Sequence, residues 1–141
     1  MEMKYKNSKT WNTNLYVFNL ALLITHEIDS AFWKEWNLFG LPGGIQGFLV
    51  VNFLLMLVAL TGFKNMISGK RSGYYFALLL AGSGIFAFGI HSYFILQGHQ
   101  EFTLPVSIVT LIILFFVSLS QGVLALITLH KNTIQRKIET P

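Results

Sequence analysis

Apolar side chains dominate four long segments of the chain, and polar or turn-forming residues separate these segments. They run roughly over Asn14–Trp33, Ile45–Phe63, Tyr74–Leu96 and Leu104–Leu129. Each is close to the about 20 residues that an α-helix needs to cross about 30 Å of hydrocarbon. The pattern therefore predicts transmembrane helices over about 14–36, 45–63, 74–97 and 104–130.

The connections between these segments are short. They consist of a turn at Pro42–Gly44, a basic and glycine-containing turn at Lys64–Gly73, and a polar link at Gln97–Thr103. Short connections make sequential helices antiparallel neighbours. We therefore expect an all-α polytopic membrane protein, an antiparallel four-transmembrane-helix bundle that forms a single domain over residues 1–141.

The composition agrees with a membrane protein and excludes several other classes. Charged residues make up 11% of the chain and hydrophobic residues 53%, whereas about 25% of the residues of a soluble domain are charged. The chain has no cysteine, which excludes disulfides, thiolate metal sites and thiol nucleophiles. Its basic residues are spread beside apolar segments rather than gathered in one patch, so a nucleic-acid partner is not expected.

The basic residues also predict an orientation, because lysine and arginine stay on the cytoplasmic side of a membrane. Of the ten lysines and arginines, only Lys34 lies in the first connection, and none lies in the third. The other nine are Lys4, Lys6, Lys9, Lys64, Lys70, Arg71, Lys131, Arg136 and Lys137. Both termini are therefore expected inside the cell (N-in/C-in). A cleaved signal peptide is the alternative interpretation of the N-terminal run, but no clear Ala-x-Ala site follows it.

The first apolar segment contains His26, Glu27 and Asp29, although a carboxylate at a helix centre costs about 2.5–3.5 kcal/mol on insertion scales. Such groups need protonation, an ion-pair partner or a bound cation. Counting 1.5 Å per residue from the predicted outer ends, His26 lies about 15 Å deep, Asp29 and Asn52 about 10 Å, and His91 about 9 Å. Polar side chains of three helices therefore share the outer half of the bilayer.

This shared depth predicts a pocket in which His26, Asp29 and His91 bind a divalent metal. Histidine and aspartate three residues apart lie on one face of a helix, and a facing histidine leaves an open position for water or substrate. Zinc is the first expectation, with iron or manganese as alternatives. The candidate catalytic carboxyls are Glu27 and Asp29, and the candidate ligand contacts are Asn52, Ser30 and Trp33.

Structural roles are the alternative for the same residues. His26 and Asp29 can form an internal ion pair, and Glu27 can pair with Lys34. Asn52 can join two helices through a hydrogen bond, and a lone His91 in an apolar helix is often a hydrogen-bonded core residue.

The run His26-Glu27-Ile28-Asp29-Ser30 resembles the His-x-x-Glu-Glu (HXXEE) signature of a family of small, uncharacterised four-helix membrane proteins. The resemblance extends to Leu41-Pro42, Asn52 and His91, and it implies a bacterial protein of the inner (cytoplasmic) membrane with a suspected enzymatic or metal-dependent role. Asp29-Ser30 replaces the paired glutamates of that signature, so a mechanism with two acids does not carry over directly. The chain resembles a sister group with a His-Glu-Ile-Asp stretch.

Three functions follow as expectations. The first is a metal site that acts on a lipid-like or other hydrophobic small molecule from the outer leaflet. The second is a metal-free, isomerase-like or ligand-binding bundle that uses a buried carboxyl as acid or base. The third is a proton- or cation-coupled carrier or assembly partner, which requires a homodimer because 141 residues are half of a typical inverted-repeat transporter. A haem held by His26 and His91 is a further alternative.

Overall fold

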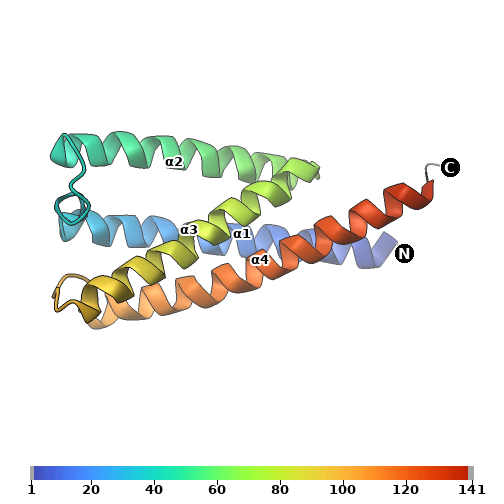
Figure 1. The fold of residues 1–141 in the computed structure, drawn as a ribbon. Helices are drawn as coiled ribbons and strands as arrows, with labels where there is room; N and C mark the ends of the chain where they lie inside the picture. Colours follow the sequence, from blue (N-terminus) through green and yellow to red (C-terminus); the bar gives the residue numbers. More distant parts are fainter. Residues whose placement is uncertain (1, 140–141) are drawn as a thin grey trace.

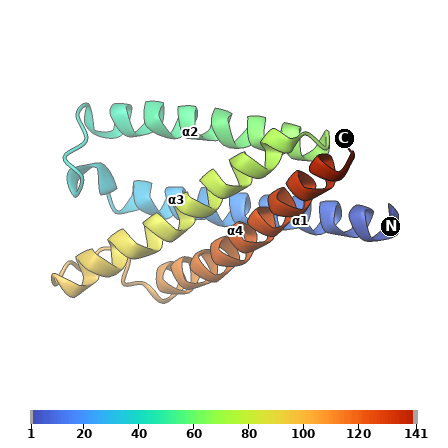
Figure 2. The same cartoon turned by 45° about the vertical axis from the view of Figure 1, so that its right-hand side comes forward.

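Four long α-helices and one short 3₁₀ helix make up the protein, for which a computed structural model describes the backbone of residues 2–139 and the side chains of residues 10–134. The helices are α1 (Glu2–Phe32), η1 (Glu35–Asn37), α2 (Gly44–Ile67), α3 (Arg71–Leu96) and α4 (Pro105–Glu139). Neighbouring long helices run antiparallel (Figures 1 and 2). The predicted all-α bundle is confirmed.

The two ends of the bundle differ. One end, called here the connection end, carries η1 and the link between α3 and α4; it lies at the left of Figure 1. The opposite end, called the terminus end, carries the α2–α3 turn, the start of α1 and the end of α4. Part of the expected orientation depends on Lys4, Lys6, Lys9, Arg136 and Lys137, whose side chains lie outside the described residues.

Within the described chain, three helical stretches are long and apolar enough to cross a membrane: Gly44–Ile67, Arg71–Leu96 and Pro105–Ile134. α1 is not among them, although four transmembrane helices were expected. Its apolar part is interrupted by Asn19, His26, Glu27 and Asp29, which lower its mean hydropathy. α1 nevertheless packs beside α4, α2 and α3 as a member of the bundle.

α1 ends at Phe32, earlier than the sequence pattern predicts. The backbone N–H of Trp33 still donates to the Asp29 carbonyl at 3.0 Å, but Lys34 adopts a left-handed conformation with φ of 55°. A left-handed residue after the last turn is a common way for a helix to stop. The chain therefore turns back over the end of α1, and Glu35 is a buried residue of η1.

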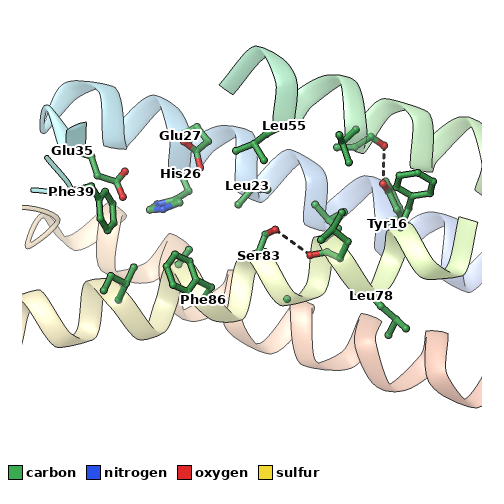
Figure 3. A pocket seen from close by; sticks show the side chains of 18 residues that line it. Tyr16, Leu23, His26, Glu27, Glu35, Phe39, Leu55, Leu78, Ser83 and Phe86 are labelled. Carbon is green, nitrogen blue, oxygen red and sulfur yellow. Dashed lines mark hydrogen bonds between the residues drawn. The ribbon is translucent and has the colours of Figure 1, made fainter. Parts of the chain in front are cut away.

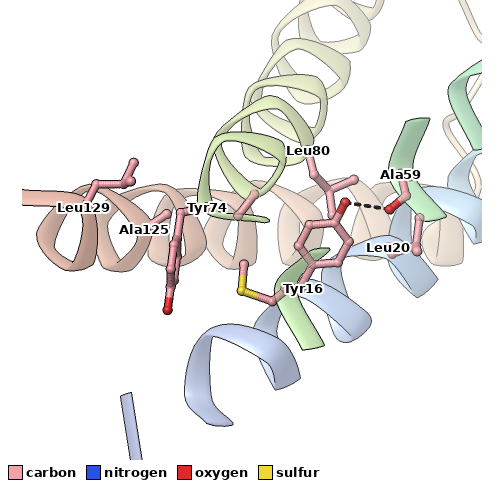
Figure 4. Close-up of a cluster of buried hydrophobic side chains, with 9 residues drawn as sticks. Tyr16, Leu20, Ala59, Tyr74, Leu80, Ala125 and Leu129 are labelled. Carbon is pink, nitrogen blue, oxygen red and sulfur yellow. Dashed lines mark hydrogen bonds between the residues drawn. The ribbon is translucent and has the colours of Figure 1, made fainter. Parts of the chain in front are cut away.

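The hydrophobic core lies toward the terminus end, where α1, α2, α3 and α4 meet around Tyr16 (Figure 4). The Tyr16 ring is fully buried, and its hydroxyl donates a 2.7 Å hydrogen bond to the Ala59 carbonyl of α2. Tyr74, Leu80 and Ala125 extend the same cluster on α3 and α4. A buried aromatic ring whose hydroxyl finds a partner fixes α1 against α2 at this level.

Buried polar side chains join α1 to α4. The Asn19 amide donates to Gln121, and the Ser118 hydroxyl donates to Asn19 at 3.1 Å. Gln121 in turn donates to the Ala77 carbonyl of α3 at 3.2 Å. Nearer the terminus end, the Asn12 amide donates to Thr128 at 3.2 Å. Interhelical hydrogen bonds of this kind contribute about 0.6 to 2 kcal/mol each between membrane helices.

α2 and α3 meet closely at the terminus end and diverge toward the connection end (Figures 1 and 2). Two glycines permit the close contact. A Cβ at Gly62 would overlap the Tyr16 hydroxyl and Phe76, and a Cβ at Gly73 would lie 2.6 Å from the backbone nitrogen of Met66. Small residues let helix backbones approach, so the two helices form a wedge that widens away from these glycines.

Candidate metal centre

Two histidines and one glutamate meet near the connection end. His26 of α1 and His91 of α3 bring their Nε2 atoms to 3.1 Å from each other. Glu35 of η1 places Oε1 at 3.4 Å from the same Nε2 of His91. One donor atom from each of the three residues lies within 4.8 Å of the other two, and all three residues are buried. Three donor groups from three different elements therefore converge on one point.

Two of the three donor separations are close to those expected around a tetrahedral metal. Two ligands that each lie about 2.0–2.1 Å from a zinc ion are about 3.3 Å apart at the tetrahedral angle. The observed separations of 3.1 Å between the two imidazole nitrogens and 3.4 Å between nitrogen and carboxylate oxygen are close to this value. Two imidazoles and one carboxylate are also a known zinc ligand set that leaves a fourth position open.

Phe102, in the link between α3 and α4, covers the two imidazoles. Its ring is 1% exposed, and its centroid lies 3.9 Å from that of His91 and 5.8 Å from that of His26. Trp33 packs against the same ring at 6.3 Å. Phe102 has a φ of 65°, and among residues 2–139 only Lys34 shares a positive φ without being glycine. Both strained residues flank the three-donor group, which is typical of functional sites.

Several buried polar atoms around the group have no hydrogen-bond partner within the described part of the chain. They include Ser30 Oγ, Trp33 Nε1 and His91 Nδ1. Ser30 lies beside Glu35 and acts on its carboxylate, although no hydrogen bond of good geometry joins them. A buried polar group without a partner costs about 1–3 kcal/mol. The connection end therefore contains buried polar atoms that make no hydrogen bond within the described part of the chain.

Burial also changes the acidity of Glu35, which lies outside the membrane-crossing helices. Its side chain is 10% exposed. Burial raises the pKa of the Glu35 carboxyl from 4.5 to about 7, the nearby Ser30 lowers it in part, and the charges of Glu27 and Asp29 raise it further. A bound cation would favour the ionised carboxylate that burial disfavours.

The structure brings together two of the three predicted metal ligands, His26 and His91. Asp29 is half-buried on α1 and does not join the three-donor group found among the described side chains. Its charge nevertheless acts on Glu35 and on His26. The third donor is Glu35 instead.

The other predicted residues lie around this group. Ser30 and Trp33 are near Glu35 and Phe102 respectively. Glu27 is half-buried and lines a cavity that begins at His26. Asn52 interacts with the Glu27 carboxyl and donates a 3.1 Å hydrogen bond to the Phe48 carbonyl of its own helix.

Sequence reasoning missed Glu35 and Phe102. The signal for Glu35 is an acid between Trp33 and Trp36, two residues that prefer the membrane interface. An acid in this position is a candidate for turning back toward a polar pocket. No comparable signal marks Phe102, since its role follows from a left-handed backbone conformation that a phenylalanine rarely adopts.

A cavity of about 570 Å³ extends from the donor group between α1, α2 and α3 (Figure 3). His26, Glu27, Glu35 and Phe39 form its end near the donors, and Tyr16 lies at the other end. The walls between are mostly apolar. Figure 3 shows Leu23 and Leu55 on two of the facing helices, with Phe86 on the third. Concave, mostly apolar pockets of about 300–1,000 Å³ with a few polar groups are the usual form of small-molecule sites.

The chain belongs to a family of unknown function, DUF6713, which matches residues 12–128. The matched region contains the donors His26, Glu35 and His91. No curated protein and no solved structure matches the chain. The expectation of an uncharacterised family is thereby confirmed, and the relation to the HXXEE family stays a resemblance of motif.

Proposed function

We propose that this protein is a membrane metal-binding protein in which His26, Glu35 and His91 hold one divalent ion, zinc first, and present it to a hydrophobic small molecule in the adjoining cavity. The observation that carries this proposal is the convergence of three buried donor groups within 4.8 Å, at one end of an apolar cavity. Ligands of metals in helical bundles come from facing helices in the same way.

The polar contacts elsewhere in the bundle support a ligand role for this group. Asn19, Gln121 and Ser118 satisfy one another between α1 and α4, as expected for side chains that only join helices. At the connection end, by contrast, the His91 ring leaves Nδ1 unpaired and shares its Nε2 between His26 and Glu35. Purely structural polar groups are normally satisfied when buried.

The orientation of the protein is part of the proposal. α1 runs beside three helices that are long enough to span a membrane, so we place all four across it. Both termini then lie in the cytoplasm, as the distribution of lysine and arginine favours. The donor group and the polar end of the cavity lie toward the outer leaflet of a bacterial inner membrane.

The chain's own residues supply the remaining chemistry. His26, Glu35 and His91 would hold the ion, and a bound zinc would supply Lewis-acid chemistry toward an oxygen of the bound molecule. Glu27, a half-buried carboxyl on the cavity wall, is the group placed to exchange a proton with that molecule. Phe102 packs on the imidazoles and excludes water from that side of them. A haem is disfavoured, because the two imidazole nitrogens at 3.1 Å leave no room for a porphyrin between them.

Metal content tests the proposal directly. The protein would be purified in detergent through a tag that needs no metal column and without chelators, and its metal would be measured by mass spectrometry. We expect about one zinc ion per chain in the wild type and a loss of metal in His91→Ala and Glu35→Gln. His130→Ala is the matched control, because His130 is an exposed histidine of α4.

Two results would contradict the proposal. One is a wild-type protein that is folded, as judged by circular dichroism, but holds no stoichiometric metal even after zinc is added back. The other is equal loss of metal from His130→Ala and His91→Ala, which would mean that zinc binds at surface histidines.

A further inference from the structure

The cavity beside the donor group is long, and its length can be compared with the membrane. On α1 it extends from Tyr16 to His26, ten residues or about 15 Å along the helix. This is about half of the 30 Å hydrocarbon thickness of a bilayer. The cavity is therefore about as long as one leaflet is thick, and its polar end lies at the connection end of the bundle.

The two ends of the cavity differ chemically. At the donor end, His26, Glu27 and Glu35 contribute ionisable groups. At the far end, the Tyr16 hydroxyl is occupied by its 2.7 Å bond to the Ala59 carbonyl. The Ser83 hydroxyl on the wall is occupied likewise, since it donates to the Leu79 carbonyl of its own helix at 3.1 Å. The walls and the far end thus offer apolar contact, and the ionisable groups gather at the donor end.

The cavity also reaches the surface of the bundle that faces lipid. Leu55 of α2 and Leu79 and Phe86 of α3 line it and are 52%, 56% and 65% exposed. These side chains lie on the two helices that diverge toward the connection end (Figures 1 and 3). A molecule dissolved in the membrane can enter between α2 and α3 without crossing the aqueous phase.

From these three features we infer that the cavity binds a single-chain amphiphile of one leaflet, such as a long-chain fatty acid, alcohol or aldehyde. Its hydrocarbon chain lies along α1 with the methyl end at Tyr16, and its terminal oxygen group lies at the His26–Glu35 end. The hydrocarbon chain enters from lipid rather than from water, so burying it adds little affinity, and selectivity derives from the polar head. Contact between the head oxygen and a metal rests on the proposed function, whereas the placement of the chain rests on the cavity.

Gly82 of α3 allows a clean test of the cavity. It lines the cavity, and a Cβ added there meets no atom within 4 Å, so a larger side chain fits without moving the backbone. Gly89 provides the matched control. It is also a glycine of α3 with open space around its Cβ, two turns further along the helix, but it does not line the cavity. We therefore compare Gly82→Phe, which fills the cavity, with Gly89→Phe.

The probe is a straight-chain fatty acid that carries a photoreactive diazirine at its methyl end, added to zinc-loaded protein in lipid nanodiscs. Labelled residues are mapped by mass spectrometry, with unlabelled palmitic acid as competitor. We expect saturable labelling near Tyr16 and Ala59, at least tenfold less labelling in Gly82→Phe, and unchanged labelling in Gly89→Phe. Gly82→Phe should keep the wild-type zinc content, which shows that it is folded.

The outcomes separate this inference from the proposed function. Labelling that is not saturable, that spreads over the lipid-facing side of α4, or that persists in Gly82→Phe means ordinary contact with bulk lipid and overturns the inference. Labelling at the His26–Glu35 end overturns the orientation of the chain. If the wild type holds no zinc but is labelled near Tyr16 as described, the chain site stands and the metal function fails. If zinc binds but saturable labelling is absent, the metal function stands and the chain site fails.

Discussion

Removing the charge of Glu35 should change the stability of the protein in opposite directions with and without metal. The Glu35 side chain is 10% exposed, and it is surrounded by groups from two other helices, α1 and α3. Glu27, Asp29 and His26 of α1 and His91 of α3 all act on it or lie in contact with the same donor group. The perturbation is Glu35→Gln, which keeps the shape of the side chain but can neither ionise nor bind metal strongly.

The magnitude follows from the pKa of Glu35. Burial raises this pKa from 4.5 to about 7 in the folded protein. Between these pH values the folded state holds a proton that the unfolded state has lost, so stability decreases as the pH rises. At 1.36 kcal/mol per pKa unit, the free energy of unfolding of the metal-free wild type should be about 3 kcal/mol lower above pH 7 than below pH 4.5. Glu35→Gln should not show this loss.

Bound metal should reverse the order of the two proteins. At a free zinc concentration about 1,000 times the dissociation constant, binding stabilises the folded wild type by about 4.1 kcal/mol, which exceeds the loss of about 3 kcal/mol caused by the buried charge. The ionised carboxylate then has a cation beside it, so its burial no longer penalises the charged form. Above pH 7 we therefore expect Glu35→Gln to be more stable than the wild type in EDTA. In zinc, Glu35→Gln should be no more stable than the wild type.

The assay is thermal unfolding in detergent, followed by tryptophan fluorescence over a pH series that crosses about 4.5 and 7. Each protein is measured in EDTA and in zinc. Glu101→Gln is the control, since Glu101 is a carboxylate of the same end that lies outside the three-donor group. The reasoning is refuted if the metal-free wild type gains stability from pH 4.5 to 7 relative to Glu35→Gln, or if zinc stabilises both equally.

Three further substitutions test other contacts. Asp29→Asn should retain zinc in elemental analysis, because Asp29 is outside the three-donor group. A loss of zinc equal to that of His91→Ala would mean that Asp29 is a metal ligand. Phe102→Ala should lower the free energy of unfolding by about 3 kcal/mol and speed the removal of zinc by EDTA, because the ring covers the imidazoles; an unchanged removal rate would contradict that role. Gly62→Ala should destabilise by about 1–3 kcal/mol, because its methyl group would overlap the Tyr16 hydroxyl, whereas Gly89→Ala should be neutral or stabilising in the same thermal scans.

Much of the fold could be predicted because it depends on one dominant property, apolar length. The segments after Ile45, Tyr74 and Leu104 are nearly free of charge, so their helices and antiparallel order follow from length and short connections. The wedge between α2 and α3 could not be predicted. It depends on which faces of the two helices meet, and glycines such as Gly62 and Gly73 show this only when their neighbours are known.

The site could be predicted only in part, for a geometric reason. His26 and His91 share a depth, and depth follows from counting residues along straight helices. Glu35 follows His26 by nine residues, which on a continuous helix turns it about 180° to the opposite face. Because α1 ends at Phe32 and Lys34 adopts a positive φ, the chain reverses and returns Glu35 to the same side. One left-handed residue thus decides which carboxylate joins the histidines.

A single polar stripe on α1 has two different roles, and its pairing with α4 separates them. Asn12, Asn19 and His26 recur at intervals of seven residues and are all buried, so they lie on one face of the helix. α4 runs antiparallel to α1 and offers partners in a fixed register. Asn12 bonds to Thr128, and Asn19 bonds to Gln121, seven residues earlier on α4.

Continuing that register by seven more residues reaches Leu114, a fully buried leucine that has no group to bond with an imidazole. If His26 were one more structural contact between α1 and α4, this position would be the place for its partner. Its contacts come instead from His91 on α3 and from the group that Glu35 completes, beside the polar end of the cavity. The stripe therefore joins the helices at Asn12 and Asn19, where α4 offers polar partners, and at His26, where α4 offers none, it meets His91 instead. This change of partner, set by the register of α1 against α4, supports a separate role for His26.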